Sequence, residues 1–283
     1  MAIALLLAGC TSDSSFGSPG APSPTGGTSA KPSLSASPSL SSSPTPTPSV
    51  SPTASPTPAP APAPVPAPVP PTPTPAAPVP EPVELQVGDE GEAVAQVQRR
   101  LQELGYFLPA VDGVFGSSLR QAVWALQKAA GIGRDGLIGP DTRAALDAGT
   151  RPTPRSTTGH VLEVDLAAQV VLAVQDGQVV ATINASSGSG RQFEALGKTL
   201  TAYTPRGDFT VVREINGTHE SSLELGAMYR PKYFRGGVAI HGAPSVPPYP
   251  ASHGCIRVSN AAINWIWDEF GAPVGTPILV YGG

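Results

Sequence analysis

Two short segments near the carboxyl-terminal end of the chain hold the residue types best suited to covalent chemistry. The first is Ile-His-Gly at residues 240–242, and the second is Ser-His-Gly-Cys-Ile-Arg at residues 252–257. A cysteine attacks only as its thiolate, so Cys255 needs a nearby imidazole to take its proton. His253 is two positions away, on the same face of an extended chain, which is a crowded geometry. His241 ends a separate segment, and strand pairing could bring it opposite Cys255.

The loop that carries Cys255 could also stabilise the charge that develops on an attacked carbonyl group. Gly254 gives this loop freedom to turn, so that the backbone N–H groups of His253, Gly254 and Cys255 can point at a developing oxyanion. The two histidines and Cys255 could instead form an open zinc site, but no acidic residue or second cysteine is spaced to help. We therefore expect a nucleophile with no metal and no cofactor.

Three further residues could contact a substrate. The planar guanidinium of Arg257 suits a peptide carboxylate, but it could equally hold the loop by donating to carbonyl groups. Tyr229 and Tyr233 could line a substrate groove, or they could form a partly exposed aromatic strand edge.

The elements that must position these residues make residues 158–283 a mostly-β domain with one or two helices. Alternating and β-branched runs predict strands, and Asp176-Gly177 between two of them predicts a hairpin. Ser259 is expected to cap a helix that ends at Gly271. The expected strands cover residues 160–166, 170–175, 178–183, 207–213, 237–241 and 276–281.

The pair of motifs resembles the active-site signature of the L,D-transpeptidase (YkuD-type) catalytic domain, and Thr-Pro-Arg-Gly-Asp-Phe at residues 204–209 matches that family as well. The resemblance implies that Cys255 is the nucleophile and that His241 is the proton donor and acceptor. It also implies that the Gly242 carbonyl fixes the imidazole tautomer, and that Ser252, His253 and Gly254 shape the active-site loop. Residues 243–251, with four prolines, should form a compact, stiff loop.

The same resemblance implies a reaction on peptidoglycan. Cys255 would attack the amide between the L-centre of a tetrapeptide stem and its terminal D-Ala, forming a thioester. An acceptor amine would then resolve this thioester to a 3→3 cross-link, and carbapenems would acylate the same cysteine. Two alternatives remain: an L,D-carboxypeptidase that uses water as the acceptor, and a non-catalytic wall-binding lipoprotein.

Residues 84–149 show helical periodicity instead. Helices are expected from about Val94 to Leu104, over residues 117–130, and from Pro140 onward, with Asp-Gly turns repeated at residues 112–116 and 135–139. The pattern resembles the peptidoglycan-binding domain that accompanies many cell-wall enzymes. Tyr106, Asp112 and Arg120 are the residues that we considered for glycan contact.

The amino-terminal part of the chain has a different composition. Residues 1–10 form an apolar stretch whose Leu-Ala-Gly-Cys ending resembles a lipobox, which implies lipidation of Cys10 and a membrane anchor. Residues 11–82 are rich in Ser, Thr and Pro, and 23 of the 35 prolines precede Val83. We expect this segment to be a disordered spacer, and residues 150–157 to be a second, short linker.

The net charge of the chain argues against nucleic acid as a partner. The formal net charge is −4, without a basic run, so nucleic acid is not expected to bind. The two cysteines lie at opposite ends of the chain and do not suggest a disulfide framework. The sequence thus predicts a multidomain, monomeric, lipid-anchored protein outside the cytoplasm. It would comprise a disordered tail, a small three-helix peptidoglycan-binding domain and a mostly-β L,D-transpeptidase domain, with peptidoglycan stem peptides as donor and acceptor.

Overall fold

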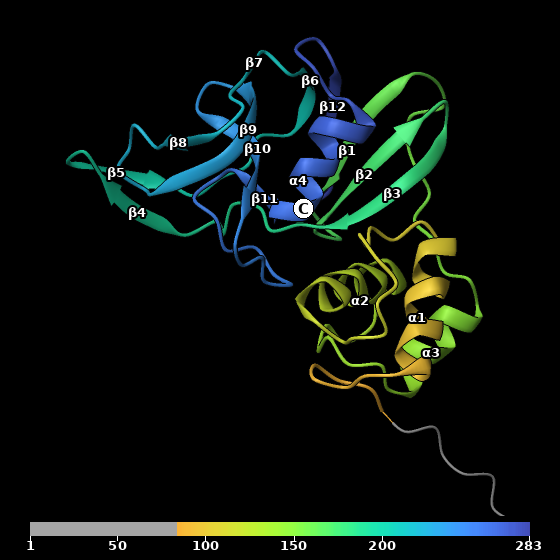
Figure 1. Cartoon of the computed structure of the whole chain (residues 1–283). Coiled ribbons are helices and arrows are strands. Elements are labelled where there is room, and N and C mark those ends of the chain that lie inside the picture. Colours follow the sequence, from red (N-terminus) through yellow and green to blue (C-terminus); the bar gives the residue numbers. More distant parts are fainter. Residues whose placement is uncertain (1–83) are drawn as a thin grey trace, which may run out of the picture. The chain divides into compact units, whose positions relative to one another are not determined.

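The structure, a computed structural model, describes residues 84–283, which belong to one compact unit (Figure 1). The expectations for Cys10 and for the Pro-rich spacer fall on residues 1–83 and lie outside the described residues. Among residues 84–283, no helix is long and apolar enough to span a bilayer.

The first part of the described chain is a three-helix domain, as the periodicity predicts. Its helices are α1 (Glu92–Glu103), α2 (Ser117–Ala130) and α3 (Pro140–Asp147). Helix α2 ends at Gly131 in the left-handed conformation that glycine favours, and α3 has Pro140 in its first turn, where its missing N–H costs nothing. Apolar side chains of all three helices form one core, among them Val94, Leu101, Val123, Leu126 and Leu146.

The repeated Asp-Gly turns of this domain are built by identical hydrogen bonds. The side-chain N–H of Gln98 donates to Asp112 (2.7 Å), and that of Gln127 donates to Asp135 (2.6 Å). Each glutamine oxygen then accepts the N–H of the glycine after its aspartate, and each aspartate accepts the N–H two residues ahead. Asp112, considered above for glycan contact, is therefore occupied in holding its own turn.

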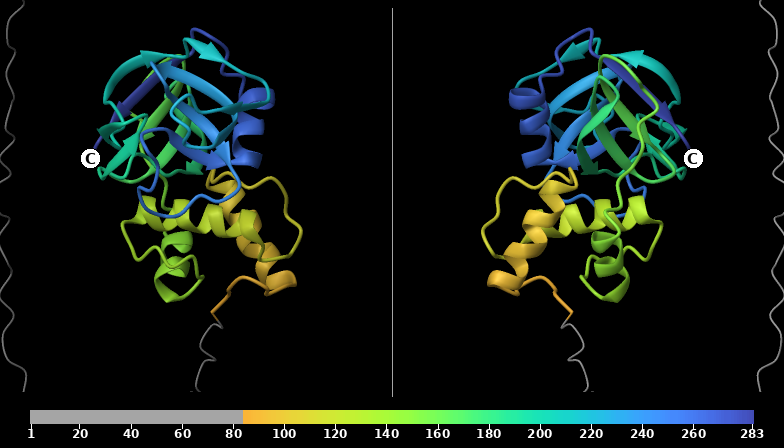
Figure 2. Two further views of the ribbon diagram at one scale, coloured as in Figure 1. Left: turned by 90° about the vertical axis from the view of Figure 1, so that its left-hand side faces the viewer. Right: turned by 90° about the vertical axis from the view of Figure 1, so that its right-hand side faces the viewer.

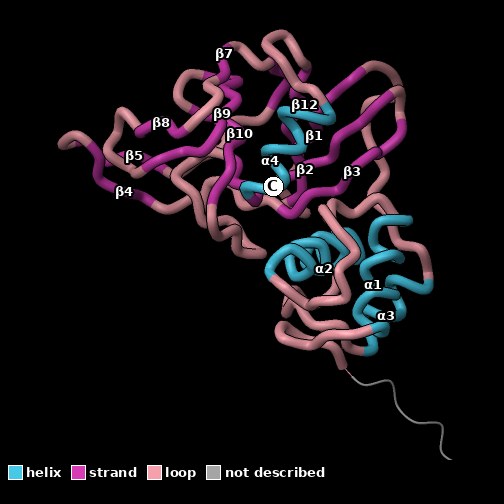
Figure 3. The backbone as a smooth tube through the Cα atoms, viewed as in Figure 1, coloured by secondary structure: helices cyan, strands magenta, loops and turns pink. Residues whose placement is uncertain are grey.

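The second part of the chain is a β-domain with two main sheets (Figure 3). The first sheet has the order β3-β2-β1-β12-β6, and the second has the order β11-β10-β9-β7, with β8 beside β9. The strands are β1 (His160–Asp165), β2 (Val170–Gln175), β3 (Gln178–Asn184), β4 (Gln192–Ala195), β5 (Lys198–Thr201), β6 (Gly207–Thr210), β7 (Arg213–Glu214), β8 (Thr218–Glu220), β9 (Ala227–Arg235), β10 (Val238–Ala243), β11 (Ile256–Ser259) and β12 (Pro277–Tyr281). Strands β4 and β5 form a separate hairpin.

The core of the β-domain lies between the two sheets and includes one helix (Figure 2). Buried side chains of β1, β2, β3 and β12 meet those of β10 and β11, and Ala262 and Ile263 of α4 (Asn260–Trp265) join them. The Ser259 hydroxyl accepts the Ala262 N–H at 3.1 Å, which confirms the expected cap. The helix continues as a π-helical turn, η1 (Ile266–Phe270), before Gly271.

Five strands were not predicted, namely β4, β5, β8, β9 and β11, and the expected strand over residues 207–213 is interrupted. The longest missed strand, β9, contains Pro231, which normally argues against a central strand. The structure accommodates it because the register between β9 and β10 shifts between Ile240 and Gly242, and Arg230 adopts a positive φ of 48°. The expected strand breaks between β6 and β7 because β6 pairs with β12 in one sheet and β7 pairs with β9 in the other.

The three-helix domain is joined to the β-domain by hydrogen bonds as well as by the chain. Thr182 of β3 donates to the Gly105 carbonyl (2.7 Å) and accepts the Phe107 N–H (2.9 Å). The linker over residues 150–157 is also bound to the β-domain. The N–H groups of Arg155 and Ser156 donate to the fully buried carboxylate of Glu163 at 3.0 and 2.6 Å.

Candidate active site

Two parallel neighbouring strands bring the two chemical motifs together. In the pairing of β10 with β11, His241 lies opposite Arg257, and Ile240 lies opposite Ile256. Side chains two positions apart share a face of a strand, so Cys255, immediately before β11, lies on the face of Arg257 and therefore of His241. All three residues line one pocket of about 470 Å³.

His241 is buried, and one of its ring nitrogens is already committed. Its Nδ1 lies 2.9 Å from the carbonyl oxygen of Gly242, which can only accept, so Nδ1 carries the proton and Nε2 is left as an acceptor. The contact expected between His241 and this carbonyl is thus present. Burial lowers the pKa of His241, which keeps the imidazole neutral near pH 7. A side chain at Gly242 would meet Asn260, Ile263 and Tyr229 within 2.9 Å, so glycine is needed there.

The thiol of Cys255 rests against weak partners. Its Sγ lies 3.7 Å from the Gly237 carbonyl oxygen and 4.0 Å from the Met228 sulfur, and no hydrogen bond within residues 84–283 joins it to His241. Burial raises the pKa of Cys255. The resting site therefore pairs a neutral thiol with a neutral imidazole, and proton transfer requires the thiol to turn toward Nε2.

The loop before Cys255 is held by Ser252 and Gly254. The buried Ser252 hydroxyl donates to the Cys255 carbonyl (2.5 Å) and accepts the Gly254 N–H (3.0 Å). Gly254 has φ 140°, and a Cβ there would lie 2.9 Å from the Tyr203 carbonyl oxygen. The expectation that the Gly254 N–H points at an oxyanion is wrong in this state, because Ser252 takes that donor; the N–H groups of His253 and Cys255 remain as candidates.

Arg257 and His253 line the pocket without strong partners. The guanidinium of Arg257 lies 3.5 Å from the Ala251 carbonyl oxygen, a long contact, so both roles weighed for Arg257 remain open. The exposed ring of His253 packs edge-on against Phe193, with the ring centres 4.6 Å apart.

The two tyrosines expected in the substrate groove lie elsewhere. Tyr233 is buried beneath Cys255 with Met228 and Ala239, and Arg213 stacks on its ring at 3.8 Å. Tyr229 packs against the main core, and neither tyrosine lines the pocket. This part of the prediction is wrong because Tyr229 packs against the main core and Tyr233 is buried against Met228 and Ala239. Met228, from the same strand, does reach the pocket.

A hydrogen-bonded path from the three-helix domain to the active-site loop was not foreseen. The buried Lys128 of α2 donates to the carbonyl oxygens of Gln169 (2.8 Å) and Ala185 (2.9 Å) and to the side chain of Asn184. The Gln169 side chain bonds to both the N–H and the hydroxyl of Ser187, whose carbonyl accepts the N–H of Ser252 (2.9 Å). Burial lowers the pKa of Lys128 to about 6, so the ammonium can donate to all three acceptors below that pH, and the neutral amine to two of them above it. No spacing rule signals this path, because its segments are far apart in sequence.

A second contact supports the Pro-rich loop that leads to Cys255. Gln121 of α2 donates to the Val246 carbonyl oxygen (3.0 Å), and Arg134 donates to that of Pro248 (3.1 Å). The three-helix domain is thus connected to the active-site loop in two ways: through the hydrogen-bonded path from Lys128 and through direct contacts with the Pro-rich loop.

The lining of the pocket around Cys255 contains a positively charged side chain and no negatively charged one. Its ionisable lining residues are His241, His253, Arg257 and Cys255, with no Asp or Glu. Among residues 84–283, no group of three or more His, Cys, Asp or Glu is placed to hold a metal ion. The arrangement offers a nucleophile, a neutral base and a cationic side chain.

Two family models match the chain, one over each part of the described structure. Residues 159–280 match the YkuD family, "L,D-transpeptidase catalytic domain", and residues 90–146 match the PG_binding_1 family, "Putative peptidoglycan binding domain".

Solved and curated proteins agree with these matches. The crystal structure of an L,D-transpeptidase from Xylanimonas cellulosilytica is 59% identical, covers 72% of this chain and 100% of that chain, and has a TM-score of 0.70. The spore cortex-lytic enzyme of Halalkalibacterium halodurans is 41% identical over 22% of this chain and 19% of its own length. The N-acetylmuramoyl-L-alanine amidase CwlM of Mycobacterium tuberculosis is 41% identical over 20% of this chain and 14% of its own. The chain thus spans a fifth or less of these two curated relatives.

Proposed function

Because the chain belongs to the L,D-transpeptidase family, with a YkuD catalytic domain preceded by a peptidoglycan-binding domain, we propose that it forms 3→3 peptidoglycan cross-links through a thioester on Cys255. One observation carries this proposal. His241 donates its Nδ1 proton to the Gly242 carbonyl and so presents an unprotonated Nε2 in the pocket that also holds the Cys255 thiol.

The first half-reaction acylates the enzyme. As the donor stem enters, Cys255 Sγ turns toward His241, Nε2 takes the thiol proton, and the thiolate attacks the carbonyl carbon before the terminal D-Ala. The C–S bond forms, the C–N bond breaks, and the imidazolium returns the proton to the departing D-Ala nitrogen. The N–H groups of His253 and Cys255 are the candidates for stabilising the oxyanion.

The second half-reaction releases the enzyme. An acceptor side-chain amine attacks the thioester carbon, a new C–N bond forms and the C–S bond breaks. His241 takes the proton that the amine loses and passes it to the Cys255 thiolate. Water in place of the amine would make the enzyme an L,D-carboxypeptidase; the site residues are identical in both cases, so the products decide.

The charges of the site suit this substrate. A stem that ends in D-Ala carries a carboxylate, and the pocket contains an arginine and two histidines but no acidic side chain. Arg257 extends from β11 beside the nucleophile and would bind that carboxylate through its fork. We place the site in the cell envelope, with Cys10 as the lipid anchor and the three-helix domain in contact with peptidoglycan.

Intact-mass spectrometry of the full chain with a carbapenem tests the cysteine. The wild type should gain one drug mass, located at Cys255 by peptide mapping. The chain contains two cysteines, so Cys10→Ala is a matched control and should acylate like the wild type. Acylation of Cys255→Ala would place the reactive nucleophile elsewhere, and absence of acylation in the wild type would favour a non-catalytic wall-binding protein. Either result would contradict the proposal.

A further inference from the structure

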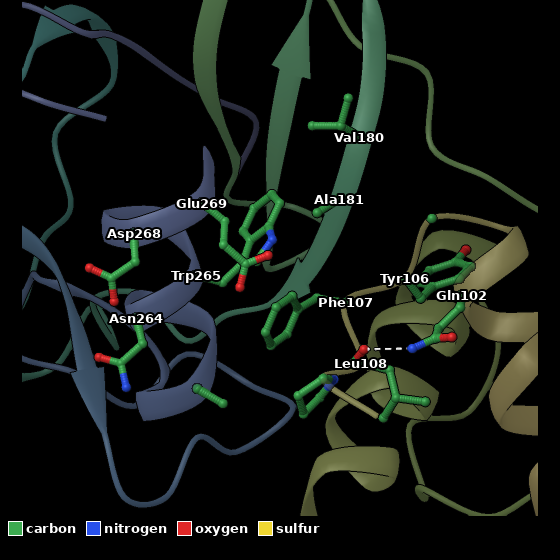
Figure 4. A pocket seen from close by; sticks show the side chains of 13 residues that line it. Gln102, Tyr106, Phe107, Leu108, Val180, Ala181, Asn264, Trp265, Asp268 and Glu269 are labelled. Carbon is green, nitrogen blue, oxygen red and sulfur yellow. Dashed lines mark hydrogen bonds between the residues drawn. The ribbon is translucent and has the colours of Figure 1, made fainter. Parts of the chain in front are cut away.

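A second groove lies where the three-helix domain meets the β-domain, and we call it the inter-domain groove (Figure 4). Its walls are Gln102 of α1, residues 105–109 after that helix, residues 180–181 of β3, and residues 261, 264, 265, 268 and 269 of α4 and η1. Its volume is about 320 Å³, at the small end of ligand sites, and it shares no residue with the pocket around Cys255.

Aromatic rings from both domains line this groove. Phe107 and Trp265, both half-buried, have ring centres 5.7 Å apart, and Phe270 stacks behind Trp265 at 5.6 Å. Within residues 84–283, the indole N–H of Trp265 has no hydrogen-bond partner. A partly exposed indole offers an apolar face and a polar donor, which suits a ligand with both kinds of surface.

Arg230 fixes the position of Asn264 and Asp268, two polar residues that line the groove. The buried guanidinium of Arg230 donates to the Asn264 side-chain oxygen (2.8 Å) and to both carboxylate oxygens of Asp268 (2.7 and 2.6 Å). Because the Asn264 oxygen is taken, its amide N–H donors remain for a ligand. Asp268 and Glu269 lie on the π-helical turn, a feature frequent at functional sites.

The charge of the groove disfavours anionic ligands. Asp268 and Glu269 are its only lining side chains that are charged at neutral pH, and Arg230 already compensates Asp268. Glu269 is left as the uncompensated charge of the lining, while the Arg151 guanidinium lies close to Gly105 at its edge. The lining favours a neutral ring compound with hydroxyl donors for the carboxylates, an amide acceptor for the indole and Asn264 N–H groups, and apolar faces for the rings.

We propose that the inter-domain groove binds the neutral, N-acetylated sugar backbone of peptidoglycan. This inference rests on the proposed function, since it names the part of the same polymer that the second groove would take. Phe107 and Trp265 come from different domains, so a bound glycan would contact both. It would hold the strand while its stem peptide enters the separate pocket at Cys255.

Binding of a neutral N-acetylated glycan tests the groove directly, and N-acetylglucosamine oligomers are the probe because they carry no lactyl carboxylate. The full chain is titrated with soluble oligomers while tryptophan fluorescence reports binding, and it is sedimented with the insoluble N-acetylglucosamine polymer as a second readout. Trp265→Ala and Phe107→Ala should each weaken binding about tenfold or more, because each removes a stacking face. Tyr203→Ala, which removes an exposed aromatic side chain outside the groove, should bind like the wild type.

Two further variants guard against loss of folding. Trp265→Phe keeps a ring in place, so it should still sediment with the N-acetylglucosamine polymer while losing most of the fluorescence response. Val180→Arg, at a position 44% exposed, should block the groove without disturbing the core. Equal binding by all variants, or no binding by the wild type, would overturn the proposal. Binding of free stem tetrapeptide at this groove in place of glycan would do so as well.

Carbapenem acylation of the same samples separates the two proposals. Acylation of Cys255 without glycan binding would remove the groove proposal and leave the transpeptidase proposal standing. Glycan binding sensitive to Trp265→Ala, with no acylation, would do the reverse.

Discussion

The two pockets differ in the sign of their charge and in how they are built. The pocket around Cys255 is lined by two histidines and an arginine, with no acid, and comes from the β-domain alone. The inter-domain groove is lined by two acids and aromatic rings, with no base, and needs both domains. One polymer offers both matching chemistries, a carboxylate-bearing peptide and a neutral glycan. If both proposals hold, the chain cleaves the stem peptide in one pocket and holds the glycan in the other.

The largest effect is expected from the proton-transfer residue. His241→Gln should lower the rate of carbapenem acylation by about a thousandfold, because the loss of a positioned general base typically costs 10²–10⁴. His253→Gln is the matched control, since this exposed ring contacts Phe193, and it should acylate close to the wild-type rate. A larger loss in His253→Gln than in His241→Gln would reverse the two roles.

Arg257 provides the positive charge of the pocket around Cys255. Arg257→Gln should raise KM for a stem tetrapeptide by about tenfold to a hundredfold, because a charge-assisted bond to a carboxylate contributes about 1.5–3 kcal/mol. Its binding of N-acetylglucosamine oligomers should not change, since Arg257 is absent from the inter-domain groove. If KM stays constant while kcat falls, Arg257 acts on the loop through Ala251 instead.

The neutral resting state of Cys255 predicts a pH dependence. Burial raises the pKa of this thiol, so its alkylation by iodoacetamide should be slow at pH 7 and rise up to tenfold per pH unit through and beyond pH ~8.5, the usual thiol range. Burial lowers the pKa of His241, so this base becomes protonated only below pH ~6.5, and the acylation rate should fall only there. An alkylation rate that is already constant from pH 6 to 8 would indicate a resting thiolate and contradict this description.

The contact between the domains predicts a smaller effect, on stability. Lys128 has a folded-state pKa of about 6, below its unfolded value of 10.5, so the unfolded chain binds the extra proton between these pH values. Stability should therefore rise with pH across this window, by at most ~1.4 kcal/mol per pH unit. Thermal unfolding at pH 7, 8 and 9 should show a steeper rise in Tm for the wild type than for Lys128→Met. Equal slopes would mean that Lys128 is not the group responsible.

Local signals predicted much of the fold. Helix α2, the Asp176-Gly177 hairpin and the Ser259 cap all depend on residues close in sequence, and the structure has them where the sequence places them. Strand β9 was missed because Pro231 breaks the local pattern, and only the bulge against β10 makes it tolerable. Propensity rules cannot foresee a tertiary accommodation of this kind.

In the candidate site as well, local sequence signals predicted some features, and others depend on tertiary packing. Residue type and motif spacing selected Cys255 and left His241 and His253 as possible bases. The family resemblance then pointed to His241 and to the Gly242 carbonyl. Neither the local signals nor the resemblance could show that Ser252 uses the Gly254 N–H or that Tyr233 lies beneath the nucleophile, because both depend on where neighbouring strands place their side chains. The sequence could not predict the inter-domain groove for the same reason, since Phe107 and Trp265 come together only through tertiary packing.

The most direct test of the central claim is product analysis of peptidoglycan muropeptides. Tetrapeptide muropeptides are incubated with the wild-type chain and with Cys255→Ala, and the products are sequenced by tandem mass spectrometry. The proposal predicts 3→3 dimers and free D-Ala with the wild type and neither with Cys255→Ala, whereas D-Ala and tripeptides without dimers would identify water as the acceptor. Equal amounts of 3→3 dimers with both proteins would contradict the account.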